Sequence, residues 1–344
     1  REGVLDLIRS GQASDSGLAS IITRKESHYL QQPLASYTLL TPISIKYGKF
    51  MKRISFGAAS FTFYPHRPKT FPIPDGGSVL VSDTTPSDYS YLKVHVKARD
   101  PWGAGENAMY SIDFLRCLWN FYYNRKINFR DTWISDGGWA PVNSILPGPI
   151  HTLHLPTGKL ALEGVWWNSY CPKMMQARQV EASYASLRRF EMYVRRQIRQ
   201  SKFADTLENV LLRYGRALDS YDSTTTILNL WSTLEVLTGV QRSNDSGKLI
   251  RRATFLDRNP IQGRLLLEYI REHRNTIAHD GSSPENIERL VFILKIYVEG
   301  LLWFAIRNSR KYSSYDKLLN ILDMPLESQE LLGDIAALKE GLRL

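Results

Sequence analysis

Cysteine and long uncharged apolar stretches are scarce in this chain. Cys117 and Cys171 are the only cysteines among 344 residues, too few for a disulfide framework or a zinc site built on cysteines. The most apolar stretch, 287–306, is interrupted by charged residues such as Lys295 and Glu299, whereas a membrane span needs about twenty mostly uncharged residues. We therefore expect a cytoplasmic protein without a membrane anchor.

Common catalytic and cofactor signatures are also missing. The sequence contains no Gly-x-Ser-x-Gly elbow and no zinc-protease helix. Gly247-Lys248 lacks the glycine that a phosphate-binding loop has five positions earlier, and we expect Trp102-Gly103-Ala104-Gly105 to be a loop. His151 and His154 lie in a segment expected to be extended, where residues three apart point to opposite sides of a strand. We expect no metal and no cofactor.

Basic residues outnumber acidic ones by 44 to 34, which gives a formal charge of +10. This surplus favours polyanionic partners such as RNA, DNA or an anionic membrane, without choosing among them. A hydrophobic content of 43% and a charged content of 23% are ordinary for a globular protein. The length leaves room for two domains with cores of their own.

The pattern along the chain divides it into three parts. Residues 1–32 are expected to be a lead-in segment, with a short helix at Val4–Ile8 and a mobile Gly/Ser/Asp-rich passage at Ser10–Ser20. Residues 33–172 are expected to be a mixed, mainly β domain. Its strand-like runs are 37–47, 50–64, 78–82, 91–97, 145–155 and 159–167, with one helix at 111–124.

Residues 173–344 are expected to be helical almost throughout. Periodic apolar residues and capping signals predict helices at 174–202, 204–218, 223–240, 247–256, 261–279, 284–308, 315–322 and 327–342. Because the connections are short, an antiparallel bundle is the natural arrangement. The predicted fold class is therefore α+β, with an N-terminal mainly-β domain followed by a C-terminal helical bundle.

The most informative stretch ends the helix at 261–279. Asp280-Gly281 should stop this helix, and Ser283-Pro284-Glu285 should start the next. Arg274 and His279 are five residues apart, about 140° around a straight helix. They converge only if the helix ends or loosens between them, or if a second copy of the chain brings its own pair. A guanidinium that stabilises charge on phosphorus and an imidazole that moves protons can together cleave a phosphodiester without metal.

The string Arg-Asn-Thr-Ile-Ala-His at 274–279 resembles the signature of the HEPN superfamily. That signature is an Arg, usually a polar residue, a few further positions and a His at a helix end. The upstream segment Leu230–Leu237 is similar to the preceding core helix of the Apea-like branch. The likeness covers about Thr224 to Asn308, roughly a quarter of the chain.

This resemblance implies a metal-independent endoribonuclease that leaves a 2′,3′-cyclic phosphate and a 5′-hydroxyl. His279 would transfer protons, Arg274 would hold the scissile phosphate, and Asn275 would orient either of them. The family usually builds its site across a homodimer formed by the helical domain. The likeness also suggests a toxin or an antiviral abortive-infection effector, which a phage-derived trigger or a cognate inhibitor would control through the β-rich domain.

Two neighbouring residues allow more than one interpretation. Glu235 lies among apolar residues, where an unpaired acid is costly. It either holds Arg274 in its working rotamer or is a carboxylate on the helix surface. His273 directly precedes Arg274, on the side of the helix that carries Tyr269 and Ile270. We expect it to be packed in the core and not catalytic.

The segment 173–202 carries eight basic residues against two acidic ones, with aromatic residues between them. Arginines on one helix can follow an RNA backbone, although most charged runs are simply solvated. The candidate RNA-binding residues are Arg188, Arg189, Arg195, Arg196 and Arg199.

Two other functions stay open. The helical domain could be a non-catalytic RNA-binding or scaffolding module in which Arg274 and His279 are structural. Alternatively, the β-rich domain could be the functional part, as a sensor of a small ligand or peptide around Trp166 and Trp167.

Overall fold

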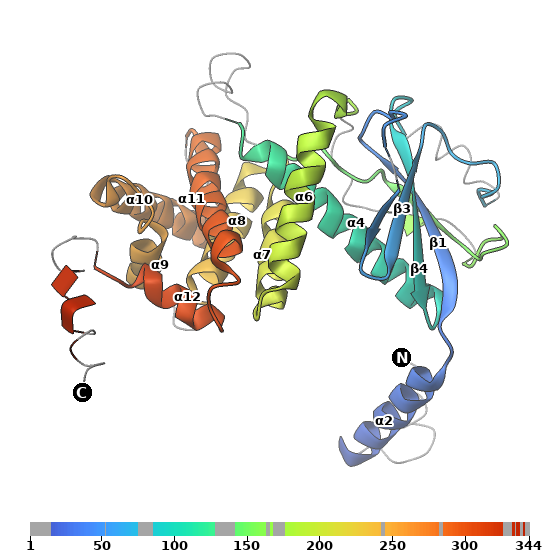
Figure 1. The fold of residues 1–344 in the computed structure, drawn as a ribbon, viewed down its shortest axis with the longest axis horizontal. Coiled ribbons are helices and arrows are strands. Elements are labelled where there is room, and N and C mark those ends of the chain that lie inside the picture. Colours follow the sequence, from blue (N-terminus) through green and yellow to red (C-terminus); the bar gives the residue numbers. More distant parts are fainter. Residues whose placement is uncertain are drawn as a thin grey trace. The chain divides into compact units, whose positions relative to one another are not determined.

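The computed structural model describes residues 15–51, 53–74, 85–127, 142–162, 166–167, 176–241, 245–281 and 285–325, with 332–333, 335–337 and 340. The chain divides into two compact units. The sheet unit comprises Arg1–Ile112 and Pro147–Cys171, and the helical unit comprises Asp113–Leu146 and Pro172–Leu344 (Figure 1). The predicted α+β class, with a mainly-β part before a helical part, is confirmed.

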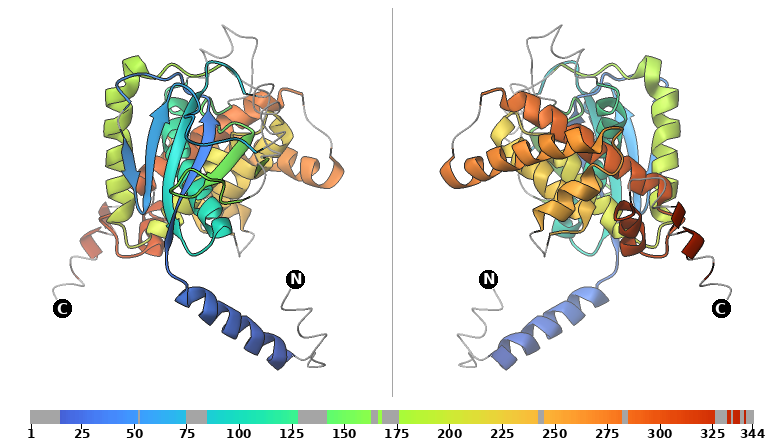
Figure 2. Two further views of the ribbon diagram at one scale, coloured as in Figure 1. Left: turned by 90° about the vertical axis from the view of Figure 1, so that its right-hand side faces the viewer. Right: turned by 90° about the vertical axis from the view of Figure 1, so that its left-hand side faces the viewer.

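The sheet unit is built on one antiparallel sheet in the order β2-β3-β4-β1-β5-β6. The left view of Figure 2 shows its strands side by side, with β5 in green next to β1 in blue. In β4 the apolar residues Leu92, Val94 and Val96 are buried, as their alternation with more polar residues predicts. The strands are β1 (Ala35–Ile43), β2 (Ile54–Phe56), β3 (Ala59–Tyr64), β4 (Ser90–Ala98), β5 (Ile150–His154) and β6 (Trp166–Trp167).

The predicted run at 50–64 is a hairpin of two strands. β2 and β3 pair with Phe56 opposite Ala59, and Gly57 between them has a φ of 51°. A glycine with positive φ at the first position of a two-residue turn matches the twist of the strands that it joins. The predicted run at 78–82 lies outside the described residues, and the described part of the run at 159–167 forms the short strand β6 and an isolated bridge of Leu160 to His154.

Two helices of the sheet unit extend beyond what the sequence predicts. Helix α2 (Asp15–Gln31) replaces most of the predicted mobile passage, because Asp and Ser favour a first helical turn as readily as a loop. Helix α4 (Pro101–Asn124) begins ten residues before its predicted start. The expected loop at 102–105 is its first turn, which begins with a proline and in which the Asp100 carboxylate accepts the Gly103 N–H at 2.8 Å. The segment Val4–Ile8 lies outside the described residues.

The helical unit contains the second half of α4 and seven further α-helices among the described residues. Their ends lie within three residues of the predictions, with one exception, and most of the predicted helix at 327–342 lies outside the described residues. Helix α6 begins at Tyr184 after a short 3-10 turn, ten residues beyond the predicted start. Helix α11 begins at Ile287, where Asn286 has a left-handed φ of 62°. The seven helices are α6 (Tyr184–Arg199), α7 (Ala204–Ala217), α8 (Ser223–Thr238), α9 (Ser246–Ala253), α10 (Pro260–Asp280), α11 (Ile287–Asn308) and α12 (Tyr315–Leu322).

Charged side chains are buried inside the helical unit, each with a partner. The Lys295 ammonium donates to Glu299 at 2.9 Å and to the Asn124 carbonyl at 2.8 Å, while the Tyr214 hydroxyl donates to the other Glu299 oxygen. These bonds tie α11 to α7 and to the end of α4. Because a buried charge is costly unless it is paired, loss of either Lys295 or Glu299 would destabilise the folded state by leaving the other charge without its partner.

We predict that Lys295→Met destabilises the helical unit by about 3–5 kcal/mol, since it leaves the Glu299 carboxylate buried without its cation. Lys295→Met combined with Glu299→Gln should recover most of this loss, because the amide oxygen still accepts from Tyr214. Urea unfolding measures both effects. The exposed Lys317→Met is the control, expected within about 0.5 kcal/mol of the wild type. Unfolding of Lys295→Met at the wild-type urea concentration would contradict the prediction.

In the sheet unit, His154 makes stability depend on pH. Its ring is buried against the Gly158 carbonyl and the Thr152 hydroxyl, and burial lowers its pKa to about 4 from an ordinary value of 6.5. Between about pH 4 and 6.5 the His154 imidazole is therefore neutral in the native state but protonated in the unfolded chain. The contribution of a neutral His154 is complete above about pH 6.5 and is lost as the pH falls towards 4.

We expect the opening free energy of β1 and β5, measured by hydrogen exchange, to fall by at most about 3 kcal/mol over this range. His154→Gln should remove most of this pH dependence because an amide does not titrate there. His66→Gln, at an exposed imidazole, should leave it unchanged. A pH slope that persists in His154→Gln would show that another group causes it.

Candidate active site

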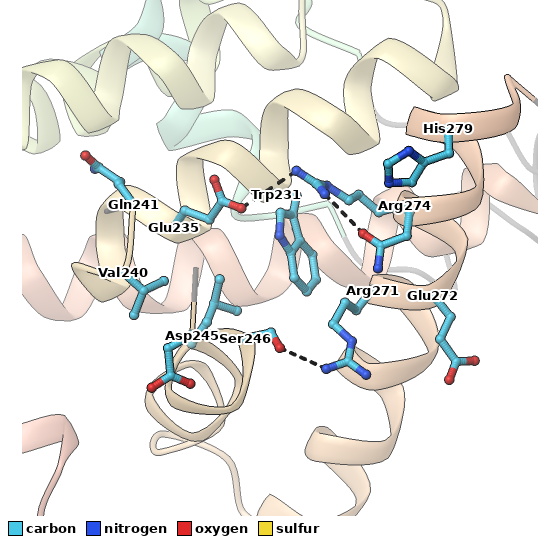
Figure 3. A pocket seen from close by; sticks show the side chains of 12 residues that line it. Trp231, Glu235, Val240, Gln241, Asp245, Ser246, Arg271, Glu272, Arg274 and His279 are labelled. Carbon is cyan, nitrogen blue, oxygen red and sulfur yellow. Dashed lines mark hydrogen bonds and ion pairs between the residues drawn. The ribbon is translucent and has the colours of Figure 1, made fainter. Parts of the chain in front are cut away.

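Helices α8, α9 and α10 surround a cavity of about 540 Å³ (Figure 3). A cavity of this size can hold part of a nucleotide chain or a small ligand. Its polar and aromatic lining consists of Trp231 and Glu235 from α8, Gln241, Asp245 and Ser246 before and at the start of α9, and Arg271, Glu272, Arg274, Asn275 and His279 from α10. The cavity thus brings together Arg274, Asn275, His279 and Glu235, all of which the sequence singles out.

Local signals in the sequence set both ends of α10. Asn259 caps its start by accepting the Gln262 N–H, and Pro260 occupies the first turn. At the other end Gly281 has a φ of 66° and donates its N–H to the Ile277 carbonyl at 3.1 Å, the left-handed termination expected of Asp280-Gly281. His279 therefore lies in the last turn. Ser283 and Pro284, the predicted start of the next helix, lie outside the described residues.

Arg274 and His279 border one cavity although α10 is unbroken between them. The expectation that they converge only through a helix break or a second copy stays a prediction. Viewed down the axis of a regular helix, Arg271 and Asn275 lie between Arg274 and His279. The four side chains therefore share a strip of the helix surface about 140° wide, and the cavity faces the middle of this strip. The side chains of Arg274 and His279 extend from α10 in the same direction (Figure 3).

The Arg274 guanidinium is only partly satisfied by the described residues. Its Nη1 donates to Asn275 Oδ1 at 3.1 Å, and its Nη2 lies 3.8 Å from Glu235 Oε1. Both members of this ion pair are about one-third exposed, so the pair adds little stability. Its Nε is buried without a hydrogen-bond partner in the described part of the chain. Glu235 is therefore a partner of Arg274, which favours the first of its two interpretations.

The sequence reasoning missed Arg271 and Trp231. Arg271 is a second guanidinium at the cavity, one turn before Arg274, and its Nη1 donates to the Ser246 hydroxyl at 2.9 Å. Its position three residues before Arg274 was a usable signal, since such pairs share a helix face. Trp231 belongs to the buried face of α8. Nothing local in the sequence shows that this face borders the cavity.

His273 does not line the cavity. It is half-buried, and its ring meets that of Tyr269 edge-on at 4.3 Å. Tyr269 itself is 51% exposed, so the contact lies on the surface, and the predicted core position is wrong. The core face of α10 is instead formed by Leu267, Ile270 and Ile277.

The five candidate RNA-binding arginines all lie on α6, but they differ in their surroundings. Arg188 and Arg195 pair with Glu191, a fully buried carboxylate that also accepts the Trp119 indole N–H at 2.9 Å. These two arginines therefore neutralise a core charge. The other three, Arg189, Arg196 and Arg199, are exposed.

His151 and His154 are buried separately in β5. The Nδ1 of His151 lies 2.8 Å from the Thr41 hydroxyl. The His154 ring contacts the Gly158 carbonyl and the Thr152 hydroxyl. Within the described ranges, no group of three His, Cys, Asp or Glu residues gathers where it could hold a metal ion. No helix in the same ranges is long and apolar enough to span a bilayer.

Comparisons of the chain with protein-family models, with curated proteins and with solved structures gave no match.

Proposed function

We propose that this protein is a metal-independent endoribonuclease of HEPN type, with its active site in the α10 cavity. The observation that carries the proposal is that Arg274 and His279 line the same cavity, where Arg274 keeps a buried Nε–H without a partner. An unsatisfied buried donor is costly. A phosphate oxygen would satisfy it with a charge-assisted hydrogen bond.

In the proposed reaction the ribose 2′-oxygen attacks the adjacent phosphorus. The bond to the 5′-oxygen of the next nucleotide breaks, which leaves a 2′,3′-cyclic phosphate and a 5′-hydroxyl. Arg274 holds the non-bridging oxygens and stabilises the negative charge that grows on them. His279 transfers a proton, either from the 2′-hydroxyl or to the leaving 5′-oxygen. Its exposed position in the last turn of α10 leaves the imidazole accessible to an RNA strand.

The neighbouring residues have supporting roles in this proposal. Asn275 and Glu235 restrain Arg274 from two sides, so less side-chain entropy is lost when phosphate binds. Arg271 is held by Ser246 and by an ion pair with Glu268 at 2.8 Å, and an adjacent phosphate would compete with Glu268 for its guanidinium. No cofactor is needed for this chemistry.

An exposed apolar ridge on α10 supports a homodimer. Ile261, Leu265 and Tyr269 are 73%, 68% and 51% exposed and follow one another at four-residue intervals, which places them on one face. His279 falls on the edge of the same face, between the ridge and the cavity. His279 lies ten residues beyond Tyr269, about 15 Å further along α10. If a second copy packs on this ridge with its α10 parallel to the first, the two His279 residues lie at the same end, and two imidazoles could then divide the two proton transfers.

The biological role follows from the resemblance alone. We propose a cytoplasmic toxin or an anti-phage abortive-infection effector that arrests its host by cutting RNA. The sheet unit would then sense a phage-derived trigger or receive a cognate inhibitor.

A second candidate function is a non-catalytic RNA-binding or scaffolding module. The ion pair of Arg274 with Glu235 favours it, because an arginine paired within its own chain can serve the fold alone. Cleavage assays separate the two candidates.

We predict that the purified protein cleaves mixed RNA in excess chelator and leaves 2′,3′-cyclic phosphate and 5′-hydroxyl ends. His279→Ala and Arg274→Ala should each lower the rate by about 100-fold or more, since each removes a proton-transfer group or a charge stabiliser. His273→Ala and Arg264→Ala change the same residue types on the same helix outside the cavity. Both should cleave at the wild-type rate. Equal rates for His279→Ala and wild type would exclude His279 as the catalyst.

The dimer generates a separate prediction. Leu265→Glu should raise the dimer dissociation constant by about 100-fold or more, because it places an unpaired carboxylate in the interface. Sedimentation equilibrium measures this change, and cleavage should fall with the dimer fraction. Tyr221→Glu alters an aromatic side chain that is 43% exposed elsewhere on the helical unit and should leave the dimer intact. A wild-type monomer with full cleavage activity would contradict the homodimer.

A further inference from the structure

A second cavity, of about 560 Å³, lies against α6 and α11 in the helical unit. It shares no lining residue with the α10 cavity. Tyr193 reaches it from α6 and Trp303 from α11, while Arg307 and Lys311 lie at and beyond the end of α11. We call it the aromatic cavity.

The wall of the aromatic cavity is held in place by packing. The Trp303 ring stacks on Phe190 at 5.6 Å with an angle of 19° between the rings, and the Arg125 guanidinium lies 4.0 Å from the Trp303 ring centre. Phe190 and Arg125 thus already contact the half-buried Trp303 ring. Tyr193 lies 5.9 Å from Trp303 and is 38% exposed. Tyr193 is therefore the ring left accessible for a planar ligand.

The charges at this cavity are of one sign. Arg307 and Lys311 are both exposed and are four residues apart, and no acidic residue is among the side chains that line the cavity. On α6, Arg189 and Arg196 lie four residues before and three residues after Tyr193. This spacing places them beside it on the helix surface, and both are exposed. The accessible ring is thus surrounded by cations.

We propose that the aromatic cavity binds a nucleobase together with its phosphate. The base stacks on Tyr193, and the phosphate contacts Arg307 and Lys311. Stacking on a ring and contact with cations are the two means by which proteins hold single-stranded nucleic acid. A cavity of this volume accommodates a ligand of nucleotide size. An acidic peptide would use the cations alone and leave the ring without a function.

The base and phosphate can come from a single-stranded RNA or from a free nucleotide. In an RNA strand, Arg189 and Arg196 would continue the phosphate path along α6. Neither source requires cleavage in the α10 cavity, so the proposal stands apart from the proposed function.

Fluorescence anisotropy with a labelled eight-nucleotide adenylate strand, methylated at every 2′-oxygen so that it cannot be cut, tests the proposal. Tyr193→Ala should weaken binding by roughly 5- to 100-fold, the effect of losing one stacked base. Arg307→Ala and Lys311→Ala should each reduce the dependence of log affinity on log salt by about one. Tyr221→Ala and Arg213→Ala are matched controls, at an exposed tyrosine and an exposed arginine away from the cavity, and should leave affinity unchanged.

Competition with AMP distinguishes the two sources. If AMP displaces the strand, the cavity binds a free nucleotide. If the strand binds and AMP does not displace it, the ligand is RNA. Either result supports the proposal. Two results would overturn it. One is no binding of either probe. The other is strand binding that Tyr193→Ala leaves unchanged and that polyglutamate displaces as well as AMP does.

Discussion

Pairing of buried charges is the constraint on which the helical unit depends. Glu191 is fully buried on α6, is neutralised by Arg188 and Arg195, and accepts a hydrogen bond from the Trp119 indole N–H. Lys295 and Glu299 are buried on α11 and reach Asn124 and Tyr214 on two other elements. Such pairs add little net stability. The ion pairs themselves lie within one helix, but each buried charge also makes a hydrogen bond to another element. A shift of one helix against another would break these hydrogen bonds to buried charges, so we infer that they fix the register of the bundle.

Both cavities depend on this register. The Glu191 contacts set the rotation of α6, which determines that Tyr193, Arg189 and Arg196 face outward. The Lys295 contacts position α11, which supplies the Trp303 wall of the aromatic cavity. Helix α11 also packs on α8, which in turn contacts α10. The buried charges of α11 are therefore connected, through α8, to the two helices that carry Glu235 and Arg274.

The sequence predicted those features that local chemistry determines. Capping residues such as Asn259 and Gly281 placed the ends of α10, and alternation in β4 placed its buried face. Errors arose where a local signal is ambiguous, as in α2, where Asp and Ser suit a helix start as well as a loop. Other errors arose where tertiary contacts alone determine whether a side chain is buried and what it pairs with. Glu191 is buried because Trp119, far away in the sequence, donates to it, and no spacing within 184–199 shows that Arg188 and Arg195 are committed to that carboxylate.

The central claim is that Arg274 and His279 hold a scissile phosphate between them in the α10 cavity. A crystal structure of the protein with a dinucleotide whose 5′ residue is a 2′-deoxynucleotide, which has no hydroxyl to attack the phosphorus, tests it most directly. The account predicts the phosphate within hydrogen-bond distance of the Arg274 Nε–H and of the His279 imidazole. A dinucleotide bound elsewhere, with the Arg274 Nε–H still unpartnered at saturating ligand, would contradict it.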